Sequence, residues 1–307
     1  MSDKFLEQIE DNPFVYHYTS IESLFAILEG YRQRKCFGLP FRAHCIYNVN
    51  DKREMELGYE TVKKILPQYE ANQPNNKHLS DVYQKAEYEK KCIEQFNEKP
   101  SDGQINMGTV PYTISFSCKR DFLPMWSMYG NDKKGACLKF NLCKLIDTNH
   151  SQKCFVYYNG DEDNLIEAYF LPLLYDFFIS NKSNPMSIED KIEELSILCE
   201  CVSPFIKSGD WAYEREFRFV YNKHYSPISF DLNDIHEDSI REFLMHGYEK
   251  TKVVDYVTLP IPANALEEIV IGPSANYHVV EHILQNELKE CILNNVEITP
   301  SSIQIRS

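Results

Sequence analysis

The chain has 307 residues, of which 43% are hydrophobic and 13% aromatic, so it can form a substantial core and global disorder is excluded. Its net charge of −14 argues against a dedicated binder of duplex nucleic acid, which normally has a basic balance. No apolar run reaches the length of a membrane span, and no apolar segment follows a basic N-terminus. Its ten cysteines include no CxxC pair. We therefore expect a cytoplasmic protein with reduced thiols and no membrane partner.

Hydrophobic periodicity predicts strands and helices along most of the chain. In chain order we expect a strand at 14–18, helices at 21–30, 50–70 and 79–97, a strand at 112–118, a helix at 123–129, strands at 136–140 and 153–158, helices at 161–181 and 187–207, a strand at 214–221, a helix at 232–250, a strand at 266–272, a helix at 276–295 and a strand at 302–306. Thr19 is expected to cap the first helix, and Gly30 to end it.

This order mixes strands and helices without regular βαβ alternation, which predicts an α+β fold rather than a doubly wound sheet. We expect mixed, mainly antiparallel sheets flanked by helices. A single domain is expected to span 1–307, with 60–108 as a helical insertion within it. In the helix at 276–295, the expected buried stripe consists of Val279, Ile283, Leu284, Leu288 and Ile292.

Two groups of polar residues in the first part of the chain are candidates for a site. His17, Tyr18, Thr19 and Ser20 lie where the first strand meets the first helix, so the histidine can present its ring to a ligand. The alternative is a half-buried histidine that is satisfied by a backbone carbonyl. The second group is Asn48-Val-Asn-Asp51 with Glu54, which a helix N-cap explains without any function.

A third group combines hydroxyl and aromatic side chains. Thr113, Ser115 and Ser117 share one face of the strand at 112–118 because side chains alternate along a strand. Trp126 and Tyr129 are three residues apart in the following helix and are therefore neighbours. Such a pair forms either core or a wall on which a flat ring stacks.

The fourth group is the segment from Trp211 to Tyr221. Read as a strand, it places Glu214, Glu216 and Arg218 on one face, opposite an apolar face that can pack on a core. A rigid strand that carries two carboxylates and a guanidinium suits a substrate site. An exposed surface ladder of charges is the alternative explanation.

The motifs H-Y-T-S, N-D-x-x-E, S-F-S followed by W-x-x-Y, and W-x-Y-E-x-E-x-R resemble an uncharacterised bacterial domain family of unknown function over residues 14–272. Their order also resembles, more remotely, that of the ADP-ribosyltransferase superfamily, which implies an ADP-ribosyltransferase-like core and NAD as a substrate. Residues that this resemblance assigns to NAD binding are His17, Tyr18, Thr19, Ser115, Ser117, Trp126, Tyr129 and Arg218.

The resemblance also implies roles for individual residues. His17 would hold the NAD ribose, and Tyr129 or Trp126 would stack on nicotinamide. Glu216 would bind the nicotinamide-ribose hydroxyl, and Glu214 would orient the acceptor. A fixed carboxylate stabilises the positive charge that develops on the ribose as the glycosidic bond breaks.

Three hypotheses follow. The first is an NAD-using enzyme that modifies a macromolecule or hydrolyses NAD, by analogy a toxin or phage-defence effector, and needs no metal. The second is a metal-dependent hydrolase or nuclease that uses Asp51, Glu54, Glu214 and Glu216 as ligands of Mg²⁺. The third is a non-enzymatic sensor that binds a nucleotide between His17, Trp126 and the glutamate strand.

Overall fold

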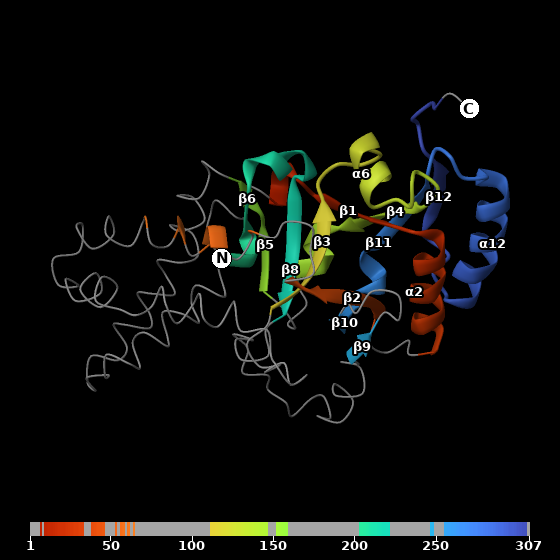
Figure 1. The fold of residues 1–307 in the computed structure, drawn as a ribbon. Helices are drawn as coiled ribbons and strands as arrows, with labels where there is room; N and C mark the ends of the chain where they lie inside the picture. Colours follow the sequence, from red (N-terminus) through yellow and green to blue (C-terminus); the bar gives the residue numbers. More distant parts are fainter. Residues whose placement is uncertain are drawn as a thin grey trace, which may run out of the picture.

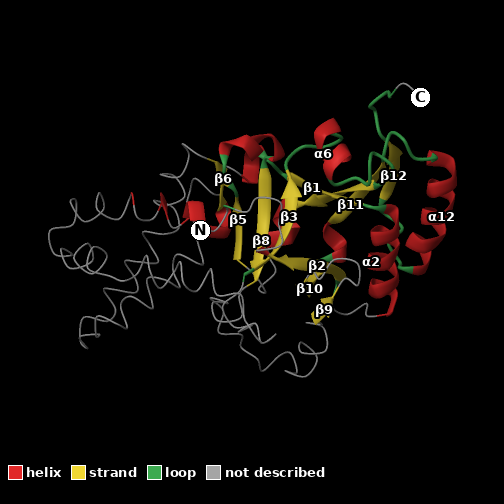
Figure 2. Ribbon diagram, in the orientation of Figure 1, coloured by secondary structure: helices red, strands yellow, loops and turns green. Residues whose placement is uncertain are grey.

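The computed structural model describes residues 9–33, 38–46, 111–146, 152–158, 203–221, 246–248 and 255–305, together with a few single positions between 7 and 64. Within these ranges the chain has an α+β fold (Figures 1 and 2). The helices are α2 (Ile21–Gln33), α6 (Leu123–Met128), α7 (Leu142–Ile146) and α12 (Tyr277–Glu290), with short 3₁₀ helices η4 (Ser203–Phe205), η5 (Gly209–Glu214) and η6 (Ala263–Ala265). None of the described helices is long and apolar enough to span a bilayer.

Most strands join one large sheet, in the order β12-β11-β4-β1-β3-β2-β10-β9, with β8 paired to both β3 and β5. Their bounds are β1 (Phe14–Thr19), β2 (Leu39–Cys45), β3 (Tyr112–Ser117), β4 (Ala136–Asn141), β5 (Gln152–Phe155), β8 (Glu216–Tyr221), β9 (His246–Tyr248), β10 (Asp255–Ile261), β11 (Leu266–Ile271) and β12 (Glu297–Pro300). Every pair in this sheet is antiparallel except β11 and β12. A separate parallel pair consists of β6 (Tyr157–Tyr158) and β7 (Ile206–Lys207). The predicted fold class, mixed and mainly antiparallel with flanking helices, is confirmed.

Strand β3 divides the sheet into two branches. One edge of β3 pairs with β8 along its whole length, from Tyr112 to Ser117. On the other edge, β2 pairs with Tyr112 and Thr113, whereas β1 pairs with Ser117. Figure 1 shows β1 and β2 leaving β3 at different levels, with β8 on its opposite side. The middle of β3 therefore faces a split between β1 and β2.

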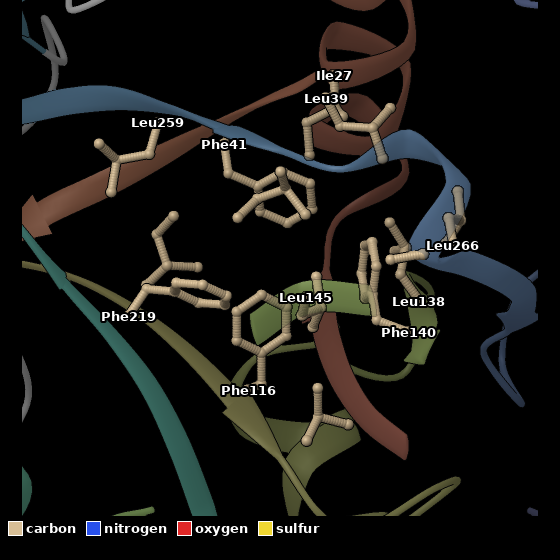
Figure 3. Close-up of a cluster of buried hydrophobic side chains, with 14 of the residues drawn as sticks. Ile27, Leu39, Phe41, Phe116, Leu138, Phe140, Leu145, Phe219, Leu259 and Leu266 are labelled. Carbon is tan, nitrogen blue, oxygen red and sulfur yellow. The ribbon is translucent and has the colours of Figure 1, made fainter. Parts of the chain in front are cut away.

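One face of the sheet forms the main core. Phenylalanines from several strands, including Phe41, Phe116, Phe140 and Phe219, are buried together there (Figure 3). Helices α2 and α12 cover this face through Leu24 and Leu28 and through Leu284 and Leu288. These two helices are also joined by an ion pair between Arg32 and Glu290. Burial of these side chains supplies the main driving force for folding, at roughly 25 cal/mol per Å² of apolar surface.

The opposite face of the sheet carries the polar residues that alternate with the core residues along β3 and β8. The cross-strand pairs Ser115–Arg218 and Ser117–Glu216 lie on this face, because Phe116 and Phe217 belong to the core on the other side. Where β1 and β4 continue the same face, Tyr18 of β1 and Trp126 of α6 belong to a smaller apolar cluster.

Several predicted elements differ from the structure. Helix α2 does not end at Gly30 but continues to Gln33. Gly30 instead allows a close approach of Pro40, because a Cβ at this position would lie 2.7 Å from the Cγ of Pro40. The hydroxyl of Ser20, and not of Thr19, accepts the backbone N–H of Ser23 and caps this helix. The predicted strand at 153–158 is two strands, β5 and β6.

Further differences lie in the second half of the chain. The strand predicted at 214–221 begins only at Glu216, since Arg215 adopts a left-handed conformation with φ 42°. Residues 203–207 form η4 and β7, and 246–248 form β9, where helices were predicted. The last strand is β12, because residues at 301 and 302 instead bind Asp121 through hydrogen bonds.

In α12 the predicted apolar stripe is only partly buried. Leu284 and Leu288 are in the core, whereas Val279 is 53% and Ile292 70% exposed. Ile283 is also exposed. Strands β2 and β10 were not predicted, although buried and partly or fully exposed residues alternate along β2. The predicted helices at 79–97 and 161–181, and nearly all of the predicted insertion at 60–108, lie outside the described residues.

Candidate functional site

A cavity of about 840 Å³ lies at the split in the sheet. Strands β1, β2, β3, β8 and β10 border it, together with α2, α6 and the segment from β7 to η5. This volume falls within the range of about 300–1,000 Å³ that is typical of small-molecule sites. The cavity is lined both by the hydroxyl-bearing face of β3 and by charged residues from β7, η5 and β8.

Four charged side chains at one end of the cavity form a buried ionic network: Lys207, Glu214, Glu216 and Arg218. Each of them is at most 4% exposed. The Nζ of Lys207 lies 2.6 Å from Oε2 of Glu214 and 3.2 Å from Oε2 of Glu216, so it joins the two carboxylates. The network contains two positive and two negative groups, which is how buried charges are normally accommodated. The predicted alternative of an exposed charge ladder is therefore wrong.

Arg218 holds Glu216 from the same strand. Its Nε donates to Oε1 and its terminal nitrogen to Oε2, each at 2.9 Å, so the contact is bidentate. The other terminal nitrogen donates to the carbonyl of Pro204 at 2.6 Å. On the backbone, the N–H of Glu216 donates to the hydroxyl of Tyr158. These contacts fix both the main chain and the side chain of Glu216.

Glu214 reaches the same network from η5 rather than from the strand. Tyr129, just after α6, donates its hydroxyl to Oε1 at 2.6 Å. The hydroxyl of Ser117 donates to the carbonyl of Glu214 at 2.5 Å, which ties the end of η5 to β3. Lys207 also lies 4.8 Å above the ring of Trp211, which belongs to η5. The 3₁₀ turn thus covers the charges of β8.

The two glutamates differ in acidity. Burial alone would raise the pKa of Glu216, but the charges of Arg218 and Lys207 and a hydrogen bond from Ser115 outweigh it and hold the pKa at about 2. Burial raises the pKa of Glu214, and the neighbouring charge of Glu216 raises it further, against the opposing effect of Lys207. Glu216 is therefore the fixed anion of the network, and Glu214 is the carboxylate that accepts a proton more readily.

His17 fills the split between β1 and β2. Its ring lies among core aromatics, 5.0 Å from Phe41 and 5.6 Å from Phe116 between ring centroids. The Nδ1 atom is 3.0 Å from the carbonyl of Ser115. Burial lowers the pKa of His17 to about 4, and nearby His44 also lowers it, so the ring is neutral at pH 7. A carbonyl only accepts, so Nδ1 carries the proton and Nε2 is left as an acceptor.

The structure brings most of the predicted site residues to this one cavity. His17, Tyr18, Thr19, Ser115, Ser117, Tyr129, Glu214, Glu216 and Arg218 all line it. Trp126 does not: its side chain is fully buried, packs edge-on against Tyr18 and donates from Nε1 to Asp121. Trp126 is therefore part of the core and not a wall of the cavity on which a flat ring could stack.

The predicted acidic ligands of a metal are only partly described. Asp51 and Glu54 lie outside the described residues, as do Asn48 and Asn50. Among the residues that the structure describes, no group of three or more His, Cys, Asp or Glu side chains is placed to hold a metal ion. The carboxylates of Glu214 and Glu216 are instead bound by Lys207 and Arg218.

Sequence reasoning missed the far side of the cavity. Arg42 and His44 on β2, and Tyr256 and Thr258 on β10, also line it. The alternation of Phe41, Arg42, Ala43 and His44 was a usable signal for a strand with one polar face. Tyr158, which binds the backbone of Glu216, had no comparable signal.

Comparison with known proteins places the network within a recognised family model. Residues 125–219 match a family described as "Protein of unknown function (DUF2971)". The matched segment runs from α6 into β8 and contains Tyr129, Lys207, Glu214, Glu216 and Arg218. This supports the resemblance to an uncharacterised domain family. Neither the curated proteins nor the solved structures contain a match to the chain.

Proposed function

We propose that the protein is an NAD-using enzyme of the ADP-ribosyltransferase kind, which cleaves the bond between nicotinamide and ribose. The ADP-ribose would pass to a macromolecular acceptor or to water. The observation that carries this proposal is the meeting of three separated motifs at one cavity: His17 on β1, Ser115 on β3 and Glu216 on β8. The cellular role of a toxin or defence effector belongs to the same proposal.

The residues of the cavity suit the steps of this reaction. When the C1′–N bond breaks, its electron pair leaves with the nicotinamide ring, and positive charge develops on the ribose. Glu216 is held ionised and supplies fixed negative charge beside that centre. An acceptor hydroxyl then bonds to C1′ and releases its proton, for which Glu214, with its raised pKa, is the suited base.

His17 and Ser115 would position the substrate. Nε2 of the neutral imidazole is an acceptor suited to a ribose hydroxyl, while Nδ1 is engaged with the carbonyl of Ser115. Because Ser115 pairs across the strands with Arg218, which binds Glu216, neighbouring strands would hold the substrate sugar and the carboxylate. The fit between substrate and site thus rests on rigid strands.

One observation favours a second candidate function, a nucleotide-binding sensor without turnover. The carboxylate oxygens of Glu214 and Glu216 already accept hydrogen bonds from Tyr129, Lys207 and Arg218. A carboxylate that is neutralised in this way stabilises a developing cation less than an unpaired one. Binding of NAD without product formation would identify this function.

The test is to incubate the full-length protein with NAD, with and without bacterial lysate, and to follow nicotinamide release by chromatography. We expect release by the wild type and its loss in Glu216→Gln. Because that substitution disturbs a buried ion pair, Ser115→Ala serves as a milder second variant, since the hydroxyl of Ser115 helps to lower the pKa of Glu216. It should reduce the rate about tenfold or more, as expected for a hydrogen bond to a charged group.

A matched control keeps the test specific. Glu297→Gln makes the same chemical change at an exposed residue of β12 that does not line the cavity, and it should leave the rate unchanged. Circular dichroism of each variant establishes that it is folded. No release by folded wild type, or full release by folded Glu216→Gln, would overturn the proposed reaction.

A further inference from the structure

A cationic and aromatic surface forms the side of the cavity opposite the ionic network. It consists of Arg42 and His44 on β2 and Tyr256 and Thr258 on β10, and we call it the β2–β10 ledge. Tyr256 pairs with His44 and Thr258 with Arg42, so the four side chains form a two-by-two array on one face. Arg42 and His44 are exposed, whereas their neighbours Phe41 and Ala43 are buried.

The ledge holds its arginine in a defined position. The guanidinium carbon of Arg42 lies 4.6 Å from the centre of the Tyr256 ring, which is a cation–π contact. The ring of His44 lies 6.3 Å from the same tyrosine. A guanidinium that rests on an aromatic ring keeps its N–H groups at its edge, where they can form a fork with a phosphate.

The ledge and the network share the same face of the sheet. His44 pairs with Thr113 of β3, and Thr113 is two residues along the strand from Ser115. Two residues of a strand span about 7 Å. Ser115 in turn pairs with Arg218 of the network. A ligand of nucleotide size can therefore contact both groups across the middle of β3.

Charge distinguishes the two ends of the cavity. The network combines two cations and two anions, whereas the ledge places Arg42 among an imidazole, a phenol and a hydroxyl. Within the described part of the chain, no carboxylate forms an ion pair with Arg42. In a protein with a net charge of −14, Arg42 therefore offers an anionic ligand a positive charge that no carboxylate of the described residues neutralises.

We propose that the β2–β10 ledge binds the phosphate groups of a nucleotide, with Arg42 as the phosphate-binding residue and Tyr256 as the ring that orients it. This inference deepens the proposed function, on which it rests for the choice of an adenine nucleotide. It assigns the diphosphate to β2 and β10 and leaves the ribose that reacts to β1, β3 and β8.

The inference is tested by calorimetric titration of the full-length protein with ADP and, in parallel, with adenosine, which lacks phosphate. The variants are Arg42→Ala and Arg42→Lys, with Arg53→Ala as the control, because Arg53 is also exposed but does not line the cavity. We expect the wild type to bind ADP about tenfold or more tightly than adenosine.

Arg42→Ala should weaken ADP binding about 10- to 100-fold and leave adenosine binding unchanged, because only the phosphate contact is removed. The affinity of Arg42→Lys for ADP should lie between those of wild type and Arg42→Ala, since lysine keeps the positive charge but cannot form the bidentate contact. Equal affinity for ADP and adenosine in the wild type, no binding of ADP, or unchanged ADP binding in folded Arg42→Ala would overturn the inference.

This experiment is independent of turnover, because ADP carries no nicotinamide. ADP binding that depends on Arg42, together with no nicotinamide release, supports the ledge and overturns the proposed reaction. Nicotinamide release that depends on Glu216, together with ADP binding that is insensitive to Arg42, supports the reaction and overturns the ledge.

Discussion

His17 and Glu216 start from opposite faces of the sheet, yet both side chains border one cavity. The imidazole reaches the carbonyl of Ser115 on β3, and Ser115 pairs across the strands with Arg218, which binds the carboxylate of Glu216. This arrangement is possible because β1 and β2 separate along the edge of β3, which lets a side chain from the core face reach the cavity. Two residues that are 199 positions apart (216 − 17) thus border one space.

We predict that Glu216→Gln lowers the free energy of unfolding by about 3–5 kcal/mol, the range observed when one partner of a buried ion pair is removed. The amide cannot neutralise Arg218, which is 1% exposed. Urea denaturation measures the change. Glu297→Gln should stay within about 0.5 kcal/mol of wild type. Unchanged stability of Glu216→Gln would show that the network contributes little to folding.

The pH dependence of stability should reveal His17. Its pKa is lowered to about 4 in the folded protein, from an ordinary value of 6.5. The unfolded chain therefore binds the proton first, and the contribution of His17 is complete above pH 6.5 and is lost as the pH falls to about 4. Wild type should lose stability in this window, and His17→Asn should lose less. The free energy of unfolding of both proteins is measured by urea denaturation at pH 7, 5.5 and 4.5. If it changes equally with pH in both, His17 is not the group responsible.

Tyr129→Phe tests the support of Glu214 without changing ring volume. Loss of the 2.6 Å hydrogen bond should cost about 1.5–3 kcal/mol, because the acceptor is charged. That bond lowers the pKa of Glu214, so its removal raises the pKa further, and a higher folded-state pKa means stability lost as pH rises. The deficit relative to wild type should therefore be larger at pH 8 than at pH 5. A pH-independent deficit would mean that the hydroxyl acts only through packing.

Gly135→Ala should disturb the end of β1. A Cβ at this position would lie 2.1 Å from the carbonyl oxygen of Thr19 and 2.8 Å from that of Gly130, both of which are backbone atoms that cannot rotate away. We expect a loss of about 2–3 kcal/mol, as for overpacked sites, measured by thermal denaturation. Lys134→Ala in the same loop is exposed and is the control, with a change within about 0.5 kcal/mol. A stable Gly135→Ala protein would show that the loop can move away from β1.

Local pattern was sufficient where a strand is apolar on one face and bounded by turns, as in β3 and β11. It failed for β2 and β10, each of which contains a proline that argues against a strand interior, at Pro40 and Pro260. These prolines lie opposite each other in a pairing between segments more than 200 residues apart, and such a pairing has no local signature.

The same limit applies to the site. Alternation suggested that Glu214, Glu216 and Arg218 share a strand face, but Arg215 breaks the strand and Glu214 reaches the network from η5. The residue types therefore pointed to the right side chains, but the alternating pattern gave the wrong secondary structure for Glu214. Burial of the charges was equally unpredictable, because the strand pattern does not show that Lys207 of β7 joins the two carboxylates or that Trp211 of η5 packs against Lys207.

The split in the sheet separates the residues that stabilise the fold from those that could determine which ligand the cavity accepts. On one branch, Glu214, Glu216 and Arg218 are buried, so substitutions of these residues destabilise the fold. On the other branch, Arg42 and His44 are exposed, and exposed positions usually tolerate change with little loss of stability. Variants of β2 and β10 can therefore sample new ligand preferences while the opposite wall stays intact, which makes this branch the natural starting point for redesigning what the cavity accepts.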